Sequence, residues 1–75
     1  MQPLTEAYSQ SEITAIFQYL DSLRESGITN MYGSPQYLQD AFDLDSTLAK
    51  EFFKLWAETF SRETSAEERA EALYQ

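Results

Sequence analysis

The chain has 75 residues, the size of one small domain, and its 13 Asp and Glu residues outnumber five Lys and Arg residues to give a formal net charge of −8. This charge repels nucleic acid phosphates and anionic lipid headgroups, so it disfavours both as partners. Cysteine and histidine are absent, which excludes disulfides, thiolate metal sites and His-based catalytic triads. Five Phe, five Tyr and one Trp supply the large side chains that so short a chain needs for its core.

The first residues differ from the rest of the chain in pattern. Residues 1–8 have no strong hydrophobic period, and Pro3 disfavours an early helix. We therefore expect an N-terminal arm over residues 1–8 and a single helical domain over residues 9–75. The segment lacks the basic start and apolar run of a signal peptide, and no stretch of about 18 apolar residues follows. These features favour a soluble, intracellular protein without a membrane partner.

The first helix is predicted over residues 10–26. Ser9 and Glu12 have the spacing of a capping box, which places the helix start close to Gln10. Gly27 is the expected C-cap, because glycine adopts positive φ without a steric penalty. Asp21 falls on the polar side, where we expect solvent. The apolar side is one stripe of helical period, which we expect in the core: Ile13, Ile16, Phe17, Leu20 and Leu23.

Two further core helices follow after a loop. Gly33, Ser34 and Pro35 have the order of a loop glycine, an N-cap and a first helical residue, which predicts a second helix over residues 35–42. A third helix is predicted over residues 46–61, with a wider apolar face than a surface helix needs. Its main stripe consists of Leu48, Phe52, Leu55, Trp56 and Phe60.

The C-terminal segment predicts a fourth helix over residues 65–74. Ser65 and Glu68 form a second capping-box pattern, but the apolar face is weak, since alanines make up most of it. Such a face packs loosely, frays or is held by another chain. The fold class that we expect is all-α, a small bundle of three core helices plus this C-terminal helix.

The second and third predicted helices have the proportions of a helix-turn-helix, with the turn at Asp43–Asp45. A DNA reader presents donors to base edges from the start of its second helix and basic residues to phosphates. Here Lys50 stands among acidic residues in that half of the helix. Nucleic acid is therefore a disfavoured partner, and a helix-turn-helix regulator remains an alternative function.

A catalytic or metal-binding interpretation has less support. Asp40, Asp43 and Asp45 are clustered, and carboxylates can act as an acid/base pair or bind Mg²⁺. A cation-binding loop, however, normally alternates its oxygen ligands around a turn glycine, which this segment lacks. The chain also has no glycine-framed serine and no phosphate-binding loop. We expect a non-enzyme with no catalytic residue, no metal site and no cofactor.

One string of residues resembles a known group of proteins. Residues 20–33 read LDSLRESGITNMYG, and Tyr37-Leu38, Phe42–Leu44 and Leu55-Trp56 follow at characteristic spacings. The pattern is similar to small bacteriophage-encoded proteins that carry an LxxLRxSGxTNMxGAxxYLxxxFxL core followed by an AxxxLxxW-type helix. The resemblance covers about residues 17–60, with serine where the relatives often have alanine after the second glycine. That group has no assigned biochemical role, so the resemblance implies a phage or prophage origin and the host cytoplasm, and no mechanism.

The residues that we expect to contact a partner are loop residues and aromatic side chains off the core stripes. They are Asn30, Met31, Tyr32, Tyr37 and Phe53. Asn30 also has a structural explanation, because asparagine stabilises loops and tolerates left-handed backbone. The function that we expect is binding of another protein, one that is basic or itself binds nucleic acid, by mimicry of nucleic acid charge or as an inhibitor. Homodimerisation through the last helix is a further alternative.

Overall fold

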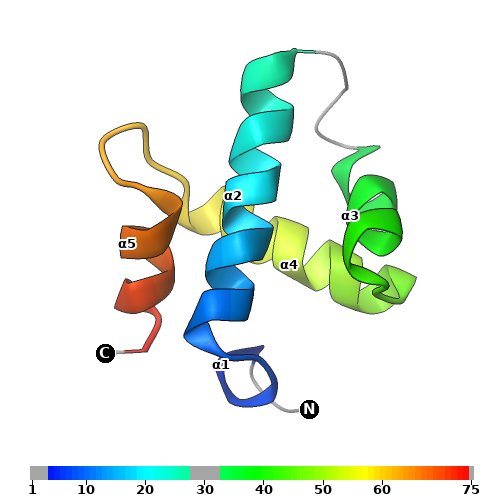
Figure 1. Cartoon of the computed structure of the whole chain (residues 1–75), viewed down its shortest axis with the longest axis horizontal. Coiled ribbons are helices and arrows are strands. Elements are labelled where there is room, and N and C mark those ends of the chain that lie inside the picture. The colour runs from blue at the N-terminus through cyan, green and yellow to red at the C-terminus, as the bar shows by residue number, and fades with distance from the viewer. Residues whose placement is uncertain (1–3, 28–32, 75) are drawn as a thin grey trace.

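The computed structural model describes residues 4–27 and 33–74, and the regular structure within them is entirely helical (Figure 1). The predicted all-α class is therefore confirmed. The helices are α1 (Leu4–Ala7), α2 (Gln10–Ser26), α3 (Ser34–Phe42), α4 (Ser46–Thr59) and α5 (Ala66–Ala72).

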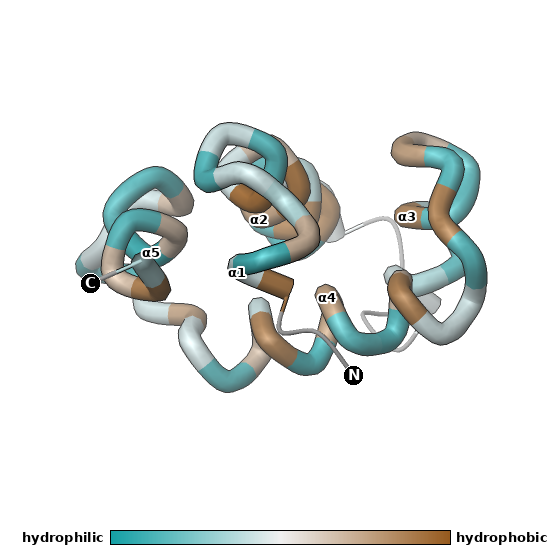
Figure 2. The backbone as a smooth tube through the Cα atoms, turned by 90° about the horizontal axis from the view of Figure 1, so that it is seen from below, coloured by the Kyte–Doolittle hydropathy of each residue, from teal (hydrophilic) through white to brown (hydrophobic). Residues whose placement is uncertain are grey.

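The longest helix, α2, organises the fold. Helix α5 packs along one side of α2 and runs in the opposite direction, while α3 lies on the other side and packs mainly against α4 (Figure 1). Seen from below, α2 and α5 lie above α4, which runs beneath the bundle from α3 toward α5 (Figure 2). Because α4 spans this distance, the α3–α4 turn and the α4–α5 connection lie at opposite ends of the domain.

Both predicted capping boxes are present. Oγ of Ser9 accepts the backbone N–H of Glu12 at 3.2 Å, and Oε1 of Glu12 accepts the N–H of Ser9 at 2.9 Å. Ser65 and Glu68 make the same reciprocal pair, both at 3.1 Å. Gly27 ends α2 with φ 66°, as the C-cap prediction required. These contacts connect residues three apart, which is why sequence spacing was enough to predict them.

Several helix ends differ from the prediction, and the last helix spans Ala66–Ala72 rather than residues 65–74. Helix α3 begins at Ser34 with Gly33 as its N-cap and without a side-chain capping bond, so Ser34 occupies the first helical position and is buried. Helix α4 ends at Thr59, two residues earlier than expected, because Phe60 adopts extended backbone with ψ 134°. This early end turns the chain toward α5.

The described part of the N-terminal arm contains a helical turn, which the sequence did not predict. Residues 4–7 form one helical turn, and the N–H of Tyr8 donates to the carbonyl oxygen of Leu4 at 2.9 Å. Both side chains pack against the core, and the Tyr8 ring meets Phe52 edge-on at 5.0 Å between centroids. An apolar contact over α4 thus offsets the poor helix signal of this segment.

The core draws on α2, α3, α4 and α5. All five predicted apolar residues of α2 are buried, and Phe52 and Trp56 of α4 are buried with them. Phe60, also expected in the core, is only half-buried. The weak alanine face of α5 packs inward: Ala66 and Ala70 are buried against the bundle, since their small side chains let the α5 backbone approach α2 closely.

Candidate functional site

The structure places two of the five predicted contact residues. Tyr37 lies on α3 with 42% of its surface exposed, an unusual fraction for a large aromatic side chain in this domain. Phe53 is half-buried, packs against the core and stacks on Trp56 with the ring centroids 6.1 Å apart. No ring contact joins Tyr37 to Phe53 among the residues described. Asn30, Met31 and Tyr32 lie outside the described residues.

Exposed carboxylates surround the end of α3. Asp40 lies one helical turn after Tyr37 and is exposed, as are Asp43 and Asp45 in the turn to α4. Asp43 is the C-cap of α3 in left-handed conformation, with φ 55°. Asp45 is the N-cap of α4, and its Oδ1 accepts the N–H of Leu48 at 2.8 Å. Asp43 and Asp45 therefore both serve helix ends.

Beside this turn is a small apolar pocket with a volume of about 150 Å³. Leu44, between the two turn aspartates, forms part of its wall together with Phe42 of α3. A volume of this order accommodates a benzene-sized group in other proteins. The remaining wall comes from α2 and the segment before it, through Tyr8, Glu12, Ala15 and Ile16. Asp43 and Asp45 flank Leu44 in the pocket wall, whereas Tyr37 and Asp40 lie on the exposed side of α3. We call these four residues and the pocket the acidic turn surface.

Glu12 is the charged residue in the wall of that pocket. Hydrogen bonds from the backbone and the side chain of Ser9 lower the pKa of its carboxyl group below the ordinary value of 4.5. Glu12 therefore adds a fixed negative charge to the acidic turn surface at neutral pH. Its charge also raises the pKa of Tyr74, although desolvation of that hydroxyl is the larger cause.

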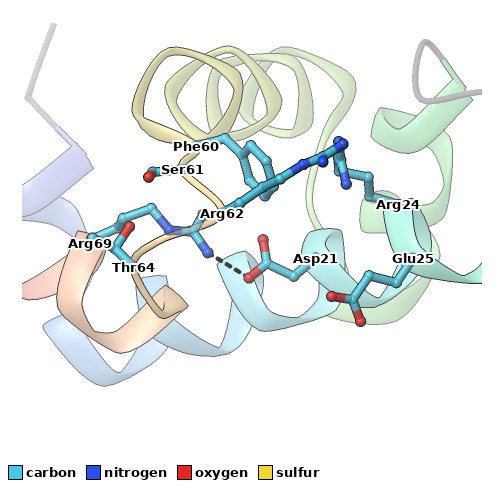
Figure 3. Close-up of a pocket in the computed structure, with 8 residues that line it drawn as sticks. All are labelled: Asp21, Arg24, Glu25, Phe60, Ser61, Arg62, Thr64 and Arg69. Atoms are coloured by element: carbon cyan, nitrogen blue, oxygen red, sulfur yellow. Dashed lines mark hydrogen bonds and ion pairs between the residues drawn. The ribbon is translucent and has the colours of Figure 1, made fainter.

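A second pocket, of about 290 Å³, lies at the other end of α4 and is lined by arginines (Figure 3). Arg24 comes from α2, Arg62 from the α4–α5 connection and Arg69 from α5, so three of the five basic residues of the chain meet here. The other lining residues are Asp21, Glu25, Phe60, Ser61 and Thr64. We call this cavity the arginine pocket.

Arg69 connects the arginine pocket to the core through Asp21. Its side chain is only 5% exposed, and its Nη2 forms an ion pair with Oδ2 of Asp21. Oδ1 of the same carboxylate accepts Nε1–H of Trp56 at 2.8 Å, so one aspartate links α2, α4 and α5. The expectation that Asp21 faces only solvent is therefore wrong: its side chain is 26% exposed and engaged by two buried groups.

The Phe60 ring separates two of the arginines. The guanidinium carbon of Arg24 lies 4.6 Å from the ring centroid and that of Arg69 lies 5.1 Å from it. Both distances suit cation–π attraction, which is stronger for a desolvated cation such as Arg69. Phe60 is thus half-buried because two cations cover its ring.

Among the described residues, no helix is long and apolar enough to cross a bilayer. No group of three or more acidic side chains in the described part of the chain is arranged to hold a metal ion. Comparison of the chain with protein-family models, curated proteins and solved structures finds no match.

Proposed function

We propose that this protein binds a basic segment of another protein through the acidic turn surface. The observation that carries the proposal is the apolar pocket beside exposed carboxylates at the α3–α4 turn. A buried apolar anchor surrounded by charge is the usual composition of a protein interface. In this arrangement the pocket accepts one apolar side chain of the partner, Tyr37 adds contact area, and the carboxylates select Lys and Arg around the anchor.

Duplex DNA is a poorer occupant of the same elements. Helices α3 and α4 have the order of a helix-turn-helix, but the turn and the start of α4 carry Asp43 and Asp45 beside Lys50. A DNA-binding turn at this place meets phosphates, and two carboxylates there repel them. A mobility-shift assay with duplex DNA at low salt is the direct check, and a salt-sensitive shift would favour the helix-turn-helix alternative.

The biological setting that we propose rests on the phage resemblance of residues 17–60. The resemblance implies the host cytoplasm, where nucleic-acid-binding proteins present basic surfaces. A net charge of −8 on 75 residues lets such a protein occupy a surface of this kind in place of nucleic acid. Modulation or inhibition of a host nucleic-acid-binding protein is thus the specific form of the proposal.

Capture of a partner by two variants, one of charge and one of the exposed ring, tests the proposal. Asp40→Asn, Asp43→Asn and Asp45→Asn together remove three charges, while asparagine still tolerates left-handed backbone and still caps a helix. Tyr37→Ala removes the exposed ring without touching the core. We expect the wild type to retain a basic host protein from lysate and purified partner to bind in a salt-sensitive way, and both variants to lose most of this binding.

A matched control has the same charge change elsewhere. Glu63→Gln, Glu67→Gln and Glu71→Gln remove three exposed charges near α5, which leaves the capping glutamate of that helix intact. The control should retain its partner like the wild type. Equal loss in both triple variants would mean that net charge alone governs binding and would contradict the assignment to the turn.

Self-association is the competing outcome. Sedimentation of the purified chain distinguishes a monomer from a homodimer, and a symmetric dimer through α5 would leave Tyr37→Ala without effect. A dimer that Tyr37→Ala dissociates would instead mean that the acidic turn surface binds a second copy of this chain.

A further inference from the structure

The arginine pocket is separate from the acidic turn surface and needs its own explanation. In a chain with 13 acidic and five basic residues, three arginines from different elements line one cavity of about 290 Å³. Like charges that gather in this way repel one another unless an anion lies between them. We propose that the arginine pocket binds a phosphate-type oxyanion, as inorganic phosphate or as the phosphate group of a small molecule.

The charges around the pocket leave an excess of positive charge. Asp21 neutralises Arg69 through their ion pair. Glu25 also lines the cavity, but in Figure 3 its carboxylate lies well away from the guanidinium group of Arg24. Arg24 and Arg62 are exposed, and neither forms an ion pair with a carboxylate among the described residues. Two guanidinium groups are therefore free to meet an incoming anion.

Two buried donors give the second, independent argument. Nη1 of Arg69 and Oγ1 of Thr64 lack a hydrogen-bond partner within the described part of the chain, although both atoms are buried. Buried polar groups in folded proteins are nearly always hydrogen-bonded, and an exception needs a reason. Since Arg69 and Thr64 both line the arginine pocket, an oxyanion in it supplies the acceptors that the protein does not.

The chemistry of these donors favours phosphate. Guanidinium groups present paired N–H donors that suit phosphate and carboxylate oxygens, and hydroxyl groups of Ser61 and Thr64 supply further single donors. Donors that arrive from α2, from α5 and from the connection between α4 and α5 surround a ligand, which suits a tetrahedral group better than a planar carboxylate. Phe60 gives the pocket an apolar wall that positions the Arg24 and Arg69 guanidinium groups.

An NMR titration of the full ¹⁵N-labelled chain with inorganic phosphate, at constant ionic strength, tests the proposal. We expect saturable shifts confined to the amides of residues 60–69 and of Arg24. Arg62→Gln should weaken phosphate binding about tenfold, since a hydrogen bond to a charged group contributes a factor of that order. Arg62 is exposed, so this variant keeps the fold, and its unfolding curve should match that of the wild type.

Three further measurements decide between outcomes. Thr64→Val, which preserves shape, should also weaken binding, and Glu25→Gln should strengthen it by removing a nearby negative charge. Lys50→Gln, which removes an exposed positive charge on α4, should bind phosphate like the wild type. Shifts that do not saturate, equal weakening in Lys50→Gln and Arg62→Gln, or acetate binding as tightly as phosphate would each overturn the proposal.

Discussion

The ion pair between Asp21 and Arg69 predicts an asymmetry in stability between its two partners. Asp21→Ala removes the acceptor of two buried donors at once, Nη2 of Arg69 and Nε1 of Trp56. Arg69→Met removes the cation, but Asp21 then keeps its hydrogen bond from Trp56 and, being 26% exposed, remains in contact with water. The methionine also fills the same space without the unpartnered Nη1.

The magnitudes differ for the same reason. An uncompensated buried charge costs about 3–5 kcal/mol, and an unsatisfied buried N–H costs about 1–3 kcal/mol. Because water reaches the site through Asp21, the low end of each range applies, so Asp21→Ala should lose about 4 kcal/mol. Arg69→Met should lose about 1 kcal/mol, the net contribution of one hydrogen bond, since Asp21 keeps its bond from Trp56. A domain of this size has a free energy of unfolding of roughly 4–11 kcal/mol, so Asp21→Ala should remove a third or more of it.

Urea unfolding followed by the fluorescence of Trp56, the single tryptophan, measures both losses in phosphate-free buffer. Far-UV circular dichroism provides a second probe that does not depend on the surroundings of Trp56. The double variant Asp21→Ala, Arg69→Met should be more stable than Asp21→Ala alone, because the buried charge is then gone. Equal losses for the two single variants, or a double variant no more stable than Asp21→Ala, would refute the reasoning.

Three other predictions concern helix ends. The lowered pKa of Glu12 means that its contribution to stability is present above pH 4.5 and is lost as the pH falls through the lower folded value; Glu12→Gln should remove this part of the pH dependence in acid urea titrations. The pKa of Tyr74 is raised, so its contribution to stability is present below pH 10.0 and is lost as the pH rises through the higher folded pKa. The Tyr74 hydroxyl donates to the carbonyl oxygen of Tyr8 at 2.6 Å, so Tyr74→Phe should abolish the alkaline loss and speed amide exchange in α5. Asp43→Gly should raise the free energy of unfolding by about 1 kcal/mol because glycine adopts φ 55° without strain, whereas Asp43→Ala should lower it; no difference between the two would contradict this.

Most of the helical fold could be predicted because its signals are local. A capping box connects residues three apart, and an apolar stripe repeats within two turns, so Ser9, Ser65 and the core face of α2 were predictable without tertiary information. The start of α3 was predicted one residue late. Ser34 was expected as the N-cap, but Gly33 is the N-cap. Ser34 is the first helical residue, and its side chain is buried.

The arginine pocket could not be predicted because its defining contact connects residues 48 positions apart. On a helical wheel Asp21 is an ordinary surface residue, and only the antiparallel packing of α5 on α2 brings it to Arg69. One local signal was present. Arg69 lies three residues after Ala66 and next to Ala70, on the face that packs, so a cation was predictable on the buried side of α5.

The two proposed sites lie at the two ends of α4 and should act independently. The helix has 14 residues and is therefore about 21 Å long, which is more than twice the Debye length of about 8 Å at physiological ionic strength. Its N-terminal end carries Asp43 and Asp45 and its C-terminal end meets the arginines, so each cluster also complements the helix dipole at its own end. Acidic residues at the N-terminal end and arginines at the C-terminal end both stabilise α4, so a chain with excess acidic residues can still contain one basic pocket.

Because the two sites lie far apart, Arg62→Gln should leave binding of the protein partner unchanged. The three Asp→Asn changes should likewise leave the phosphate titration unchanged. Coupling between them would mean that both ligands use one continuous surface.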